Sequence, residues 1–154
     1  MSLPQQPARA IDLGDLTGSL GFLLRLAQIE AFEMFYEGLE DARIKPGEFT
    51  VIYVIQRNPG IRQGILAERL SIKRAHMTKL IRRFEVQKVV ARHVPDDDRR
   101  AVELTLTPTG EALVARHTDA VLAQAGRESD RLAPDEARQL IALLRKFTGL
   151  EETP

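Results

Sequence analysis

The 154-residue chain contains no cysteine and no tryptophan, and aromatic residues make up only 5% of it. The lack of cysteine excludes disulfides, cysteine-based metal sites and all thiol chemistry. No apolar run approaches the roughly 18–20 residues that a membrane span requires, and no signal peptide opens the chain. Because 44% of the residues are apolar and 29% are charged, the composition is that of a globular protein. We therefore expect one compact, cytoplasmic subunit with a flexible tail at residues 1–10.

Motifs for catalysis are also lacking. His76, His93 and His117 do not have the HxxxH spacing of a zinc site, and the chain has no P-loop, GxGxxG or GxSxG motif. No serine, threonine or lysine has an evident adjacent base. The acidic triplet at residues 96–98 leaves a small enzyme or a cation site as an alternative, although the adjoining arginines oppose a cation. We predict no catalytic residue, no metal and no cofactor.

The net charge is zero, which at first argues against a nucleic-acid partner. The charge is unevenly placed, however: residues 1–68 carry a net charge of −3, residues 69–100 carry +6, and residues 101–154 carry −3. Between Lys73 and Arg83 there are five basic residues and no acidic one. Such a cluster forms either a solvated face or a binding surface, and its structural context decides between the two.

Helical spacing of apolar residues predicts a long helix from Asp12 to Leu39. The run Phe49–Ile55 is apolar throughout, so taken alone it fits a buried strand as well as a buried helix. Later helices are expected over Pro108–Arg131, with Thr107 as its cap, and from Pro134 to about Leu150.

The segment between these helices predicts a helix-turn-helix. A short helix spans Gln63–Leu70, with Ile65 among its inward residues, and Ser71 is the expected N-cap of a second helix over Lys73–Gln87. This second helix places four apolar residues on one side and its cations on the opposite side; the apolar residues are Met77, Leu80, Ile81 and Phe84.

Two short strands, Val89–Val94 and Ala101–Leu106, form a hairpin with a charged tip, which completes a winged helix-turn-helix. We predict that the second helix enters the major groove of double-stranded DNA and that Arg99 and Arg100 at the tip reach the minor groove, oriented by Asp98. The alternative is a flexible tip whose exposed Asp–Arg pairs contribute little. The DNA-binding residues expected on the helix are Lys73, Arg74, Ala75, His76, Thr78, Lys79, Arg82 and Arg83.

The sequence resembles the MarR family of winged-helix transcription regulators. The resemblance rests on the segments LAERLSIKRAHMTKLIRRFE, VVARHV and DDRRAVELTLTPTG. The family signature D-x-R-x5-L-T is met in full by Asp98, Arg100, Leu106 and Thr107. One departure is Lys88, which stands where the family commonly has glycine in the turn into the wing; a left-handed residue there costs about 1 kcal/mol more with lysine.

The resemblance implies a mainly helical fold with a small β-wing. It implies a helix for Phe49–Ile55, a recognition helix at Ser71–Gln87, and a homodimer formed by the N-terminal helix and the last two helices. The expected organisation is a dimerisation helix at 11–45, a DNA-binding domain at 46–107 and dimerisation helices at 108–150.

The resemblance further implies a ligand-responsive repressor of a pseudo-palindromic operator. Small aromatic or phenolic anions, or acyl-CoA thioesters, act as effectors in this family and bind in the crevice between dimer helices and wing domain. Phe22, Arg25, Tyr36 and Tyr53 could line such a pocket, although aromatic residues at helical spacing also fit a core role. A winged-helix adaptor that contacts protein instead of DNA remains an alternative.

Overall fold

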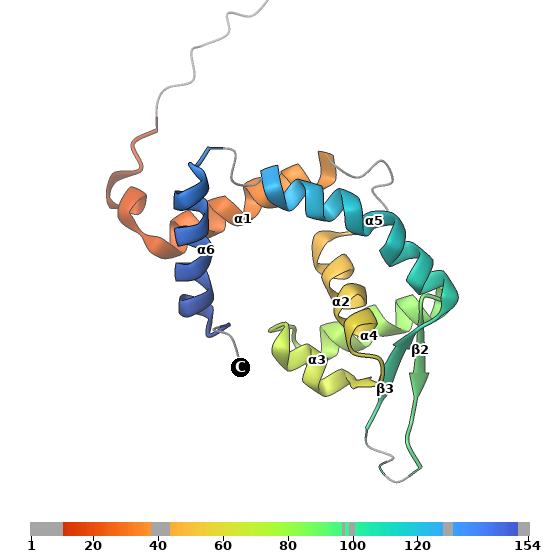
Figure 1. The fold of residues 1–154 in the computed structure, drawn as a ribbon. Helices are drawn as coiled ribbons and strands as arrows, with labels where there is room; N and C mark the ends of the chain where they lie inside the picture. Colours follow the sequence, from red (N-terminus) through yellow and green to blue (C-terminus); the bar gives the residue numbers. More distant parts are fainter. Residues whose placement is uncertain (1–10, 38–43, 97, 99–100, 128–130, 151–154) are drawn as a thin grey trace, which may run out of the picture.

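The computed structural model describes residues 11–37, 44–96, 98, 101–127 and 131–150, without the side chains of 37 and 124–127. Helices dominate, and a three-stranded sheet projects from one end (Figure 1). This confirms the predicted fold class. In chain order the elements are η1 (Gly14–Gly18), α1 (Leu20–Glu37), α2 (Pro46–Arg57), β1 (Ile61–Arg62), α3 (Gln63–Arg69), α4 (Arg74–Val86), β2 (Val90–His93), β3 (Glu103–Leu106), α5 (Pro108–Arg127) and α6 (Pro134–Thr148).

The ambiguous run Phe49–Ile55 is helical and lies within α2, as the family resemblance implied. Phe49, Ile52 and Ile55 recur every three residues and are buried together with Val51. The carboxylate of Glu48 accepts a hydrogen bond from the backbone N–H of Lys45 at 3.3 Å, which helps to cap the start of α2. Burial on several sides of α2 explains why its apolar residues show no clear helical periodicity.

The wing contains a strand that the sequence did not predict. β1 is only two residues long and pairs with β3, opposing Ile61 to Leu104, so that the antiparallel sheet has the order β1-β3-β2. A two-residue strand is too short to show alternation. It nevertheless ties the start of α3 to the wing, because Gln63 N–H also donates to the carbonyl of Val102 at 2.8 Å.

Three local predictions are wrong. Ser71 is not an N-cap: it has a φ of +53°, and the cap position of α4 is Lys73, which makes no side-chain capping bond. Ile65 is 49% exposed instead of facing the core. The N-terminal segment is not one helix, because η1 ends at Gly18 and Ser19 is extended before α1 begins.

The junction between wing and α5 is closely packed. The Thr107 hydroxyl accepts a hydrogen bond from Gly110 N–H at 3.2 Å, which confirms the predicted cap, and it donates to the carbonyl of Lys88. Lys88 has a φ of +57°, so the left-handed turn is retained although glycine is absent. Glycine is required at 110, since a Cβ there would lie 2.1 Å from the carbonyl oxygen of Val89.

The core lies between α2, the helix-turn-helix, the sheet and α5. Its most deeply buried side chains are Val51, Ile52, Ile55, Leu66, Met77, Ile81, Leu104 and Val114. Figure 1 shows α5 lying along α1, and α6 away from the wing. In the part of the chain described, no helix is long and apolar enough to span a membrane.

Apolar side chains of α1 and α6 remain uncovered in the protomer. They are Leu20, Leu23, Leu26, Ile29 and Phe32 on α1 and Leu140, Ile141, Leu143 and Phe147 on α6. These are two of the helices expected to form a dimer. The predicted division at residues 45 and 107 stays a prediction, and the predicted tail at 1–10 lies outside the described residues.

Candidate nucleic-acid interface and effector cavity

The helix α4 has one buried and one exposed side. Met77, Leu80, Ile81 and Phe84 are buried, as the spacing predicted. On the other side the basic residues Lys73, Arg74, Lys79 and Arg82 are exposed, together with Ala75 and His76. Within the described residues, none of these four cations has an ion-pair partner. Their charge is therefore available to a polyanion.

Arg83 has different surroundings from the other cations of α4. Its guanidinium lies 2.7 Å from a carboxylate oxygen of Glu48 on α2 and 5.5 Å from the centre of the Phe84 ring. Glu48 is itself largely buried, with 14% of its side chain exposed. The structure places Arg83 in an ion pair that joins α4 to α2, and its predicted contact with DNA stays a prediction.

Thr78 is held between the two helices of the helix-turn-helix. Its hydroxyl donates to the Arg74 carbonyl at 2.9 Å and accepts a hydrogen bond from the side-chain amide of Gln63 at 3.1 Å. Gln63 is the first residue of α3 and was not among the predicted site residues. Gln63 is a polar residue at the first position of the predicted Gln63–Leu70 helix, and this position could have identified it as a candidate site residue.

The wing contributes Asp98, whose carboxylate lies 3.5 Å from the guanidinium of Arg62 on β1. Both side chains are well exposed, so this pair contributes little to stability. Asp97, Arg99 and Arg100 lie outside the described residues. The predicted minor-groove contact of the two arginines, and its orientation by Asp98, therefore stay predictions.

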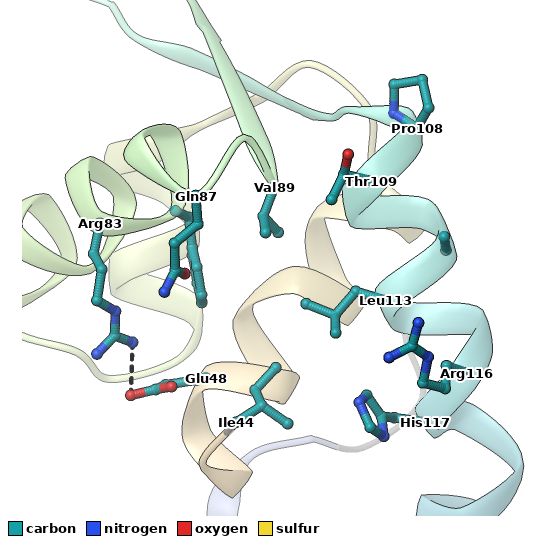
Figure 2. A pocket seen from close by; sticks show the side chains of 12 residues that line it. Ile44, Glu48, Arg83, Gln87, Val89, Pro108, Thr109, Leu113, Arg116 and His117 are labelled. Carbon is teal, nitrogen blue, oxygen red and sulfur yellow. Dashed lines mark ion pairs between the residues drawn. The ribbon is translucent and has the colours of Figure 1, made fainter. Parts of the chain in front are cut away.

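A cavity of about 650 Å³ lies between α2, α4 and α5 (Figure 2). Its volume is in the range of sites that bind small molecules. Its wall combines apolar and polar side chains, and it is lined by Ile44, Glu48, Arg83, Phe84, Gln87, Val89, Pro108, Thr109, Ala112, Leu113, Arg116 and His117. Arg83 is thus both part of α4 and part of this wall.

His117 is the one described polar residue that is buried, with 6% of its surface exposed. Its imidazole makes no hydrogen bond within the described residues, which is unusual for a buried polar group. Figure 2 shows Arg116 and His117 on α5, across the cavity from the Arg83–Glu48 pair. A ligand with an anionic or hydrogen-bonding group could therefore pair with Arg116 and His117 at this end of the cavity.

None of the four predicted pocket residues lines this cavity. Phe22, Arg25 and Tyr36 lie on α1, where Tyr36 contacts Phe35 edge-on with ring centres 5.9 Å apart. Tyr53 lies on α2 and stacks on Phe49 at 5.8 Å. Their part in a pocket stays a prediction.

His117 could have been found from the sequence. It lies in the apolar stripe of α5 formed by Leu113, Val114 and Val121, where a histidine stands out. Its distance in the sequence from the other two histidines excludes a zinc site but says nothing of this placement.

The model of the MarR family matches residues 43–101, from just before α2 to just before β3. A protein of Thauera aromatica named "Putative transcriptional regulatory protein for hcr operon" is 34% identical over 143 residues, which cover 92% of this chain and 86% of the relative. The chain belongs to the MarR family. This family consists of DNA-binding transcription regulators and not of enzymes.

Solved MarR-type structures share the fold over nearly the whole chain. The repressor CouR bound to a 23-mer DNA duplex has a TM-score of 0.82 and 28% identity, covering 90% of this chain and 98% of CouR. CouR bound to p-coumaroyl-CoA has a TM-score of 0.80 and 26% identity, over 90% and 97% of the two chains. BpsR of Bordetella bronchiseptica, whose DNA binding is regulated by 6-hydroxynicotinic acid, has a TM-score of 0.79 and 26% identity, over 86% and 94%.

Proposed function

We propose that this protein is a cytoplasmic, ligand-responsive repressor that binds a pseudo-palindromic operator as a homodimer. The observation that carries the proposal is the exposed side of α4, where four cations have no ion-pair partner among the described residues. A helix that is apolar on one side and basic on the other can pack on the core while it enters a major groove. The DNA-bound structure of CouR supports this arrangement.

The dimer is formed by the apolar sides of α1 and α6, together with α5. In a two-fold dimer the two α4 helices enter successive major grooves about one helical turn apart, so the half-sites have a fixed spacing. A change in the relative position of the two winged domains then weakens DNA binding without any change in the contacts within one domain.

The effector occupies the cavity between α2, α4 and α5. Arg116 and His117 bind its anionic group, and Leu113 and Phe84 contact an aromatic or aliphatic body. CouR binds p-coumaroyl-CoA and BpsR responds to 6-hydroxynicotinic acid, and both compounds have a hydroxylated aromatic ring with a carboxyl or acyl group. Because Arg83 belongs to α4, a ligand in this wall changes the position of α4 and favours a state with lower DNA affinity.

The test begins with a duplex selected from a random pool by the wild-type dimer. Binding is followed by fluorescence anisotropy while benzoic, hydroxybenzoic and hydroxycinnamic acids and their CoA thioesters are added. We expect at least one class to weaken DNA binding by about 5–150-fold, the range of typical allosteric coupling. Arg116→Ala should abolish this response and leave DNA binding intact, whereas Arg138→Ala on α6 should change neither. If no compound acts, or if Arg116→Ala responds as wild type does, the effector site is elsewhere.

A further inference from the structure

The contact between Gln63 and Thr78 joins the two helices of the helix-turn-helix next to the basic surface of α4. The donor and acceptor atoms lie 3.1 Å apart, in partly buried surroundings. The backbone of Gln63 is fixed as well, since its N–H donates to Val102 of the wing. Gln63 is thus held by the wing on one side and holds a side chain of α4 on the other.

The hydroxyl group of Thr78 has only one proton, and that proton is donated to the Arg74 carbonyl at 2.9 Å. One of its lone pairs accepts from Gln63. Thr78 therefore has no hydrogen-bond donor left for a base or a phosphate. One lone pair remains as an acceptor, and the methyl group offers an apolar contact that matches the C5-methyl group of thymine.

A threonine in a helix ordinarily divides between two χ1 rotamers, because its hydroxyl can bond the preceding turn in more than one way. The amide of Gln63 favours the rotamer in which the hydroxyl faces α3. The position of the methyl group is then fixed too. Within the described residues the carbonyl oxygen of the Gln63 side chain has no partner, so this side chain is committed to Thr78 and not to another protein group.

A groove of about 380 Å³ lies beside this contact, between the starts of α3 and α4 and the wing. Arg62, Gln63 and Arg74 line it, with Asp98 on the side of the wing. Glu68 also lines the groove, and Arg62 pairs with Asp98. The positive charge that remains for a DNA phosphate passing between α4 and the wing is that of Arg74, which has no ion-pair partner among the described residues. Gln63 is therefore next to both the backbone path and the helix that faces the bases.

We propose that Gln63 is a positioning residue for sequence readout: it orients Thr78 so that the threonine methyl group contacts the C5-methyl of one thymine in each half-site. The inference rests on the proposed function, that α4 enters the major groove. It assigns a specificity role to a residue of α3, outside the recognition helix.

The test replaces each thymine of the selected duplex in turn by uracil, which removes only the C5-methyl group. For the wild-type protein we expect one position per half-site at which uracil weakens binding about fourfold, the effect of burying one methyl group. Thr78→Ser keeps the hydroxyl and removes the methyl, so it should lose this uracil penalty. Thr78→Val keeps a methyl in place and should retain it.

Gln63→Ala should reduce the uracil penalty to below about twofold at the same position, and in a Thr78→Val background it should have no further effect. Gln139→Ala, an exposed change on α6, is the matched control, and circular dichroism verifies that every variant is folded. A full penalty in Thr78→Ser would overturn the methyl contact, and a full penalty in Gln63→Ala would overturn the positioning role. Failure of the proposed function gives a different result, because the wild-type protein would then select no duplex at all.

Discussion

Arg82 and Arg83 are neighbours in the sequence but have different surroundings on α4. Arg82 is exposed and without an ion-pair partner among the described residues, whereas Arg83 pairs with the largely buried Glu48. The sequence predicts both as DNA contacts, because angular position on a helix does not reveal what a long, flexible side chain binds. The partner of Arg83 comes from α2, and no pattern within α4 could have shown it.

The first prediction concerns these two arginines. Arg82→Ala should weaken binding to the selected duplex about tenfold, since it removes a DNA contact worth roughly 1–3 kcal/mol. Arg83→Ala should weaken it less than about threefold, because that charge is already neutralised within the protein. Fluorescence anisotropy at a fixed salt concentration measures both. A larger loss for Arg83→Ala than for Arg82→Ala would show that Arg83 leaves Glu48 to bind DNA.

The second prediction concerns Lys88, where the expected left-handed turn is present in spite of the lysine. Lys88→Gly should raise the free energy of unfolding of the dimer by up to about 1 kcal/mol, because glycine adopts a positive φ without the steric cost of a Cβ. Urea unfolding at equal protein concentration measures the change. Gln87→Gly is the control: Gln87 has a φ of −76°, so glycine there should destabilise the protein. Equal effects at the two positions would contradict the explanation.

At the scale of elements, the sequence patterns predicted α3 to α6, both strands of the hairpin and a helix that includes α1, whereas the helical state of α2 was implied by the family resemblance. Spacing of apolar residues was sufficient for α4, whose four predicted core residues are all buried. It was insufficient for α2, which is buried on several sides, and for β1, which pairs with β3 only through tertiary contact. The predicted N-cap role of Ser71 was also wrong, because a positive φ in a tight turn depends on the geometry of both flanking helices.

The third prediction concerns the packing of α5 on the turn into the wing. Gly110→Ala should destabilise the protein by at least about 2 kcal/mol, because its Cβ would overlap a backbone oxygen that cannot move aside easily. Gly64→Ala in α3 is the control, since a Cβ there meets no atom within 4 Å. Thermal unfolding of the two variants tests this. A Gly110→Ala protein as stable as wild type would show that α5 is not fixed at this point.

At the scale of the whole molecule, the neutral total charge conceals a basic segment between two acidic ones. The basic segment contains α4 and the wing, and the acidic segments contain the helices whose apolar sides are uncovered. The predicted basic residues Lys73, Arg74, Lys79 and Arg82 are indeed exposed, and their contact with DNA stays a prediction. Sequence analysis did not locate the cavity, since residues distant in the sequence, such as Glu48 and His117, meet there only after α2, α4 and α5 have packed.

The fourth prediction concerns the dimer. Ile141→Asp places a charge on the uncovered apolar side of α6, where 56% of the isoleucine is exposed in the protomer. It should shift the protein from dimer to monomer in sedimentation equilibrium, and DNA binding should fall with it because two half-sites can no longer be bound together. Gln139→Asp, two residues away and about 200° around the same helix, should leave the dimer intact. A dimeric Ile141→Asp protein would mean that this side of α6 is not the interface.

The central claim is that the cations of α4 and the wing bind the DNA backbone. The most direct measurement is the affinity of the wild-type dimer for its selected duplex between 50 and 200 mM salt. A regulator that makes roughly 6–10 phosphate contacts should lose about 10³–10⁵-fold in affinity over this range. An affinity that is independent of salt, or no binding to any duplex, would contradict the claim and favour an adaptor that contacts another protein.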